Sequence, residues 1–172
     1  MKKIWLVISL VFYFSVTFQT NAQWYYQSID TTVQFGGITF TNLNNGIIVG
    51  ANYDSTTTIT PPSIIMKTND GGLNWNMDSY ATAAYLDKIL SYDDNNLIAV
   101  GDYGTIIRTT NGGTTWIQEV SGVLYGLLDI EFIDLNTQII ASSGGVILKT
   151  TNSGNEWNQI TTGTTNPLLD VH

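Results

Sequence analysis

The sequence predicts an all-β protein made of tandem four-stranded antiparallel units, and three observations support this prediction. Trp75, Trp116 and Trp157 are spaced 41 residues apart. Short runs rich in Ile, Val, Thr and Tyr precede each Trp in the same order, separated by Asn, Asp and Gly, as strands and turns are. No segment shows the hydrophobic period of a helix. A repeat of about 40 residues with four strands is typical of one blade of a β-propeller.

Residues 1–22 have the three parts of a secretory signal peptide. Lys2 and Lys3 precede an uncharged, mostly apolar run at residues 4–18, and Thr20-Asn21-Ala22 offers a small-residue cleavage site. The run is shorter than the roughly 20 residues of a membrane helix, and no second apolar run follows. We therefore expect a mature chain of residues 23–172 that is secreted, periplasmic or on the cell surface and has no membrane span. An uncleaved anchor is the alternative.

The composition excludes several classes of function. Removing residues 1–22 leaves 4 basic and 14 acidic residues, a net charge of −10. Such a surface repels nucleic acid and anionic lipid. The chain has no cysteine, which excludes disulfides, thiolate metal sites and a lipid-modified cysteine. The fold must therefore be held by its apolar core, which a hydrophobic content of 43% can supply.

The strands of the central unit are expected at residues 85–92, 97–102, 105–110 and 116–120, with the Trp at the start of the fourth. The first unit follows the same order, but its first two strands lie 51 residues before those of the second unit and not 41, because about 10 extra residues lie within 51–62. Trp24 fits this shifted register, so repeats end near Trp24, Trp75, Trp116 and Trp157 in a propeller segment of residues 23–172. Residues 169–172 match 128–131, the first strand of a unit. Three units are fewer than the four to eight blades of a closed propeller, so we expect a partial propeller, either a piece of a longer protein or one that closes by self-association.

One octet with the pattern Ser/Thr-x-Asp/Asn-x-Gly-x-x-Trp closes the turn before each fourth strand. We expect the Asp or Asn to accept hydrogen bonds from backbone N–H groups two residues on, and the Gly to adopt a positive φ. The Trp supplies a large apolar face to bury between adjacent blades. Because the acidic position accepts neutral Asn, we interpret it as a structural turn, not as a metal or catalytic site. The residues of this set are Asp70, Gly72 and Trp75, then Asn111, Gly113 and Trp116, and then Asn152, Gly154 and Trp157.

This octet resembles the Asp-box, also called the bacterial neuraminidase repeat. Residues 101–116, GDYGTIIRTTNGGTTW, look very like a blade of the photosystem II assembly and stability factor family. That resemblance implies a non-enzymatic propeller that binds a protein partner. Members of the family use a basic patch on one face, whereas this chain is acidic. The resemblance therefore carries over the blade type and not the photosynthetic role.

Sialidases also carry such boxes, and they use an arginine triad with a Tyr–Glu pair. This chain has one arginine, Arg108, at a repeat position shared by Lys67 and Lys149, so the sialidase chemistry is absent from the segment. We therefore predict an exported, non-enzymatic scaffold for protein binding or complex assembly. A fragment of a sialidase-like glycosidase and a glycan-binding surface module are the alternatives.

The other candidate features point to binding and not to chemistry. The extra residues 52–62 should project from the end of the unit opposite the boxes, where Tyr53 and Asp54 form a candidate binding loop. Residues 93–96, DDNN, match turns elsewhere and lack the spaced oxygen ligands of a calcium loop. His172 is the only histidine. We accordingly expect no metal and no cofactor, and a protein or a surface glycan as the partner.

Overall fold

The structure is a computed structural model that describes residues 32–52, 62–78, 82 and 84–172. These residues form three four-stranded antiparallel sheets and one 3-10 turn. The first sheet consists of β1 (Val33–Phe40), β2 (Gly46–Asn52), β3 (Ser63–Thr68) and β4 (Asn76–Asp78). The second consists of β5 (Leu86–Ser91), β6 (Leu97–Gly101), β7 (Ile106–Thr109) and β8 (Ile117–Glu119), with η1 (Asp102–Gly104) between β6 and β7. The third consists of β9 (Leu127–Phe132), β10 (Gln138–Ser142), β11 (Val146–Thr150) and β12 (Asn158–Thr161).

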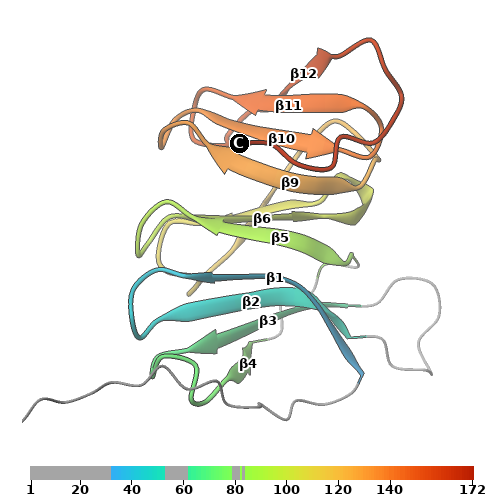
Figure 1. Ribbon diagram of the computed structural model, residues 1–172. Coiled ribbons are helices and arrows are strands. Elements are labelled where there is room, and N and C mark those ends of the chain that lie inside the picture. Colours follow the sequence, from blue (N-terminus) through green and yellow to red (C-terminus); the bar gives the residue numbers. More distant parts are fainter. Residues whose placement is uncertain (1–31, 53–61, 79–81, 83) are drawn as a thin grey trace, which may run out of the picture.

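The three sheets are stacked as consecutive blades. Each sheet runs in chain order from its first strand to its fourth. The first strands are neighbours, so β1 lies beside β5 and β5 beside β9 (Figure 1). This arrangement confirms the prediction of four-stranded β-propeller blades, and each strand of the second blade ends within one residue of its predicted bounds. Among the described residues, no helix is long and apolar enough to cross a bilayer.

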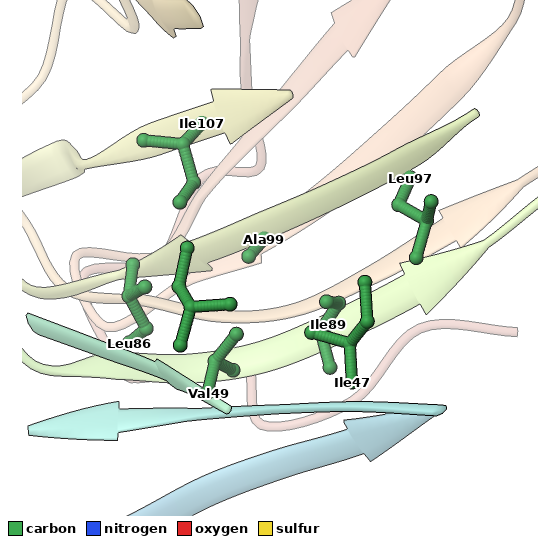
Figure 2. Packing of buried hydrophobic residues seen from close by; sticks show 8 residues of the cluster. Ile47, Val49, Leu86, Ile89, Leu97, Ala99 and Ile107 are labelled. Carbon is green, nitrogen blue, oxygen red and sulfur yellow. The ribbon is translucent and has the colours of Figure 1, made fainter. Parts of the chain in front are cut away.

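The core lies between the blades and not within a single sheet. All five residues of β6 are buried, because side chains on both of its faces meet a neighbouring blade. Ile47, Val49 and Ile65 of the first blade pack against the second blade's Leu86, Ile89, Leu97, Ala99 and Ile107 (Figure 2). A second cluster joins the second and third blades in the same way. The fourth strands, at the outer edge, are largely exposed.

A β-bulge recurs at the same repeat position of every first strand, which the sequence analysis did not predict. The register shifts at Gly36 in β1, at Asp87 in β5 and at Leu128 in β9. A Cβ atom at Gly36 would lie 2.0 Å from the carbonyl oxygen of Leu86. Gly36 therefore allows the bulge of the first blade to approach the backbone of the second.

Several predicted features lie outside the described residues. These are the signal peptide at residues 1–22, Trp24, and the candidate binding residues Tyr53 and Asp54. The two ends of the insertion are described, and the N–H of Asn52 donates to the carbonyl of Pro62 at 3.1 Å. Since β2 and β3 are antiparallel, this connection leaves the first blade at the end opposite its box turn.

Candidate functional site

The box turns lie at one end of the blades, between the third and fourth strands. In the second blade, the Thr109 hydroxyl donates to Asn111 Oδ1 at 2.8 Å and accepts from the N–H of Gly113 at 3.0 Å. The other two boxes repeat both hydrogen bonds from Thr68 and Thr150. The box Thr is thus a main element of the turn, and its identity in all three octets is the sequence signal that could have found it.

The Asp or Asn of the box reaches further along the chain than expected. Asp70 Oδ1 accepts from the N–H of Asn74 at 2.9 Å, four residues on, and Asn111 Oδ1 accepts from the N–H of Thr115 at 2.9 Å. The expectation of a bond two residues on was wrong. The reason is that two consecutive residues with positive φ reverse the chain, which brings the fourth N–H back to the side chain.

Those two positions are the box Gly and the residue before it. The expected positive φ is present at Gly72 (89°), Gly113 (77°) and Gly154 (84°). In the first two boxes the preceding residue is also a glycine with positive φ, whereas the third has Ser153 at 59°. A left-handed conformation disfavours any residue with a Cβ, so Ser153 is a point of strain.

The Asp/Asn position of the box is occupied by Asp70, Asn111 and Asn152, and only Asp70 carries a charge. The N–H and the side-chain amide of Asn74 both donate to its carboxylate, as does the Thr68 hydroxyl, and these bonds lower the pKa of Asp70 to about 2. The amides of Asn111 and Asn152 occupy the same place without charge. The position thus serves as a hydrogen-bond acceptor for the backbone.

The box tryptophans lie at the faces between blades. Trp116 packs on the cluster between the first and second blades, and Trp157 on the one between the second and third. Trp75 packs on Ile48, Ile64 and Met66 at the other face of the first blade. Each Trp stands one residue before its fourth strand. Trp116 and Trp157 cover the side of their blade that faces the preceding blade, and Trp75 covers the corresponding face of the first blade.

In the first and second blades, a basic residue near the end of the third strand bridges the blade to the box turn of the next. Lys67 donates to the carbonyl of Gly113 and pairs with Asp78 at 2.7 Å. Arg108 pairs with Glu119 at 2.5 Å and donates to Asn155 Oδ1 in the third blade at 2.7 Å. The single arginine therefore takes part in joining two blades.

Two equivalent grooves open beside these bridges at the box end. The first, of about 360 Å³, is lined by Lys67, Asp94 and Gly112. The second, of about 170 Å³, has Arg108, Leu135 and Ser153 at the matching positions. Their basic residues are already engaged, so these grooves are seams between blades.

A different surface lies at the opposite end of the second blade. A groove of about 520 Å³ runs between η1 and the segment after β8. Tyr103 (58% exposed), Val120 (85%) and Leu124 (85%) form its apolar rim, and Tyr125 beside them is 49% exposed. We call these four residues the apolar rim. Tyr103 also has a positive φ of 56°, which is unfavourable for an aromatic residue.

The apolar rim departs from the repeat. The positions 41 residues later, in the third blade, are Gly144, Thr161, Thr165 and Asn166, all of which are small or polar. The third blade therefore forms its turns without apolar side chains at these positions, although the ring of Tyr125 does pack on Gly144 of that blade. The sequence analysis overlooked the rim, and comparing the loops of the two units would have found it.

Two carboxylates on first strands, those of Asp87 in β5 and Asp129 in β9, are partly or fully buried. Burial raises the pKa of Asp87, at the bulge, to about 6, and the nearby charge of Asp102 adds to the shift. On the next first strand, Asp129 Oδ1 lies 2.8 Å from Lys88 Nζ. Among the described residues, no group of three or more His, Cys, Asp or Glu side chains could hold a metal ion.

Comparisons with known proteins agree with this blade architecture. The solved structure of "YCF48 bound to D1 peptide" is similar with a TM-score of 0.61 at 22% identity, over 75% of this chain and 40% of that chain. YCF48 from Cyanidioschyzon merolae gives 0.59 at 15% identity, over 77% and 42%. The chain therefore spans less than half the length of either structure, and at these identities the likeness shows the fold. No curated protein matches the chain. The family model described as photosynthesis system II assembly factor YCF48 matches residues 16–171, so this chain belongs to that family.

Proposed function

We propose that this protein is an exported, non-enzymatic scaffold that binds a segment of a protein partner in the groove bordered by the apolar rim. The observation that carries the proposal is the rim itself. Its four side chains are exposed, gathered at one end of one blade, and replaced by small or polar residues in the next repeat. Exposed apolar clusters of this kind mark interaction sites.

The shape and charge of the groove indicate the chemistry of the partner. The groove begins at Gln118 and Glu119 of β8, the outermost strand of its sheet, and continues along the segment after it, so an extended peptide can lie in it. Tyr103 and Leu124 offer contacts to apolar side chains. The net charge of −10 for residues 23–172 favours a segment with flanking basic residues, because opposite charge steers encounter.

Family membership supports a partner of this class. The family is described as an assembly factor, and one of the similar structures holds a D1 peptide. A non-enzymatic role fits Arg108, whose guanidinium is engaged by Glu119 and Asn155. Export rests on the pattern of residues 1–22. Expression with secretion followed by mass spectrometry of the mature N-terminus tests it: Gln23 is the expected first residue, and an intact chain in the cell would contradict export.

The binding site can be tested by separating the side chain of Tyr103 from its backbone strain. Tyr103→Gly removes the ring and suits the positive φ, so stability should be maintained while binding is lost. Leu124→Asp places a charge on a side chain that is 85% exposed and should leave the fold intact. Linear peptides selected from a random library against the wild-type chain serve as the probe. We expect each variant to raise their dissociation constant about tenfold or more.

Ser153→Gly is the matched control, because it relieves a similar backbone conformation at the box end. It should leave peptide affinity unchanged. If the selected peptides bind all three variants as tightly as the wild type, the groove is not the site. Binding to a glycan array that Tyr103→Gly abolishes, with no peptide selected, would assign the rim to a glycan instead.

A further inference from the structure

The two grooves at the box end differ in size although they lie at equivalent places. We call the groove between the first and second blades the first seam, and the groove between the second and third blades the second seam. Their volumes are about 360 and 170 Å³. Most of the positions that line them are equivalent in the repeat. The difference in size therefore lies in the side chains.

An aromatic pair occupies part of the second seam, and hydroxyl residues take its place at the first. Phe132 lines the second seam, and its ring meets that of Tyr92 edge to face, with 5.5 Å between the ring centroids. Ser91 and Thr41 are the equivalent residues at the first seam. The hydroxyl of Ser91 lies 3.0 Å from that of Thr39 on the first blade. Two small side chains thus leave open the space that two rings fill in the next repeat.

The chemistry of the first seam also departs from the repeat. Asp94 takes the position of Leu135, and Asn76 takes that of Ile117. Apart from Ile47 and two glycines, every residue that lines the first seam is polar or charged. The equivalent turn and strand of the next blade form with the apolar residues in place, so the repeat does not impose this polarity.

Four side chains of the first seam carry hydrogen-bonding groups that no other described residue uses. In the second blade Asn96, the equivalent of Asn45, donates to the carboxylate of Asp93 at 2.8 Å, whereas the amide of Asn45 makes no such bond within the described part of the chain. All four side chains are exposed. The set is Asn45, Asn69, Asn76 and Asp94.

The ionic groups of the first seam favour a neutral ligand. Lys67 pairs with Asp78 at 2.7 Å and donates to the carbonyl of Gly113, so its charge is already engaged. Asp94 has no ion pair with another described residue, and its negative charge repels an anion. Amides donate and accept hydrogen bonds, and a carboxylate accepts them. Sugar hydroxyl groups match this set, because each of them can do both.

We propose that the first seam binds one residue of a neutral sugar, whose hydroxyl groups bond to the amides of Asn45, Asn69 and Asn76 and to the carboxylate of Asp94. Its volume of about 360 Å³ lies within the roughly 300–1,000 Å³ of small-molecule pockets, and that of the second seam lies below it. The first seam is at the box end and the apolar rim is at the opposite end, so this site is separate from the peptide groove.

NMR titration of ¹⁵N-labelled residues 23–172 tests the site. The probes are glucose, galactose, mannose and N-acetylglucosamine, each as the free sugar and as a disaccharide. We expect saturable shifts of the side-chain amide signals of Asn45, Asn69 and Asn76 with at least one of them. Tighter binding of a disaccharide assigns the seam to a glycan chain, and equal binding assigns it to a free sugar.

Two variants import the residues of the second seam into the first. Asp94→Leu removes the free carboxylate and should weaken sugar binding about tenfold or more. The double variant Thr41→Tyr with Ser91→Phe fills the groove without changing the four polar side chains, and it should abolish the shifts. Both variants carry residues that the repeat already accommodates at these positions, so the strands should form as before. Unchanged amide signals in the third blade verify this.

Leu124→Asp, in the apolar rim, is the control. It should leave sugar binding unchanged while it weakens peptide binding, so the two proposals fail separately. The absence of saturable shifts with every neutral sugar up to about 50 mM overturns the inference, as does binding that both seam variants leave intact. Tighter binding of N-acetylneuraminic acid than of the neutral sugars would contradict the argument from charge and overturn the assignment of a neutral ligand.

Discussion

Gly113→Ala should destabilise the protein by distorting both a turn and the contact between two blades. Gly113 has a φ of +77°, which costs an alanine about 1 kcal/mol. The added Cβ would also lie 3.1 Å from Ile47 Cδ1, 3.2 Å from Lys67 Cε and 3.3 Å from Trp116 Cζ2. Overpacking of this kind adds roughly 1–2 kcal/mol, so we expect a total loss of about 2–3 kcal/mol in the free energy of unfolding.

Two other glycines separate these contributions. Gly163 has a φ of +83° with no atom within 4 Å of the added Cβ, and Gly72 has a φ of +89° with contacts at 3.6 Å. Their alanine variants should each lose only about 1 kcal/mol, from the backbone alone. Urea unfolding followed by tryptophan fluorescence measures all three, with an unchanged m-value. If Gly113→Ala costs no more than the other two, the box glycine does not contribute to packing between blades.

Two further substitutions test local strain and pH dependence. Ser153→Gly should raise the free energy of unfolding by about 0.5 kcal/mol, since relief of the φ of 59° outweighs the greater entropy of an unfolded glycine, and urea unfolding measures it. Asp87 has a pKa of about 6 in the folded protein, above its ordinary 3.8. The folded state therefore holds this proton more tightly, and the contribution of Asp87 to the free energy of unfolding falls as pH rises from about 4 to 6. Asp87→Asn should therefore stabilise the protein at pH 7, by about 1 kcal/mol after allowance for the partial solvent exposure of Asp87, and by little at pH 4. Equal effects at the two pH values would contradict the assignment.

The sequence was sufficient to predict the blades because their determinants are local and repeated. The spacing of Trp75, Trp116 and Trp157 fixed the length of the unit. The runs before each Trp carried the β-branched residues of strands. The strands of the second blade accordingly lie where they were expected. The insertion between β2 and β3 did not obscure the pattern, because a loop can lengthen without shifting the strands beside it.

The features that were missed depend on backbone geometry within a blade or on contacts between blades. The bulges at Gly36, Asp87 and Leu128 share a position but no residue type, so no motif marks them. The role of the box Thr was overlooked because the turn was expected to be closed by the Asp or Asn alone. Lys67 and Arg108 were seen to share a position, but the partner of each lies on the following blade, 46 and 47 residues along the chain.

The repeat itself separates residues that build blades from residues that are free to serve another purpose. Where a role is structural, the chemistry is kept although the residue changes: Lys67 and Arg108 both bridge to a box turn, and Asp70 and Asn111 both accept a backbone hydrogen bond. The apolar rim shows the opposite behaviour, because its chemistry is lost entirely in the third blade, whose turns are nonetheless formed. Stability of the blades therefore does not account for an exposed, strained aromatic residue such as Tyr103, and this is the physical argument for testing it as a binding residue.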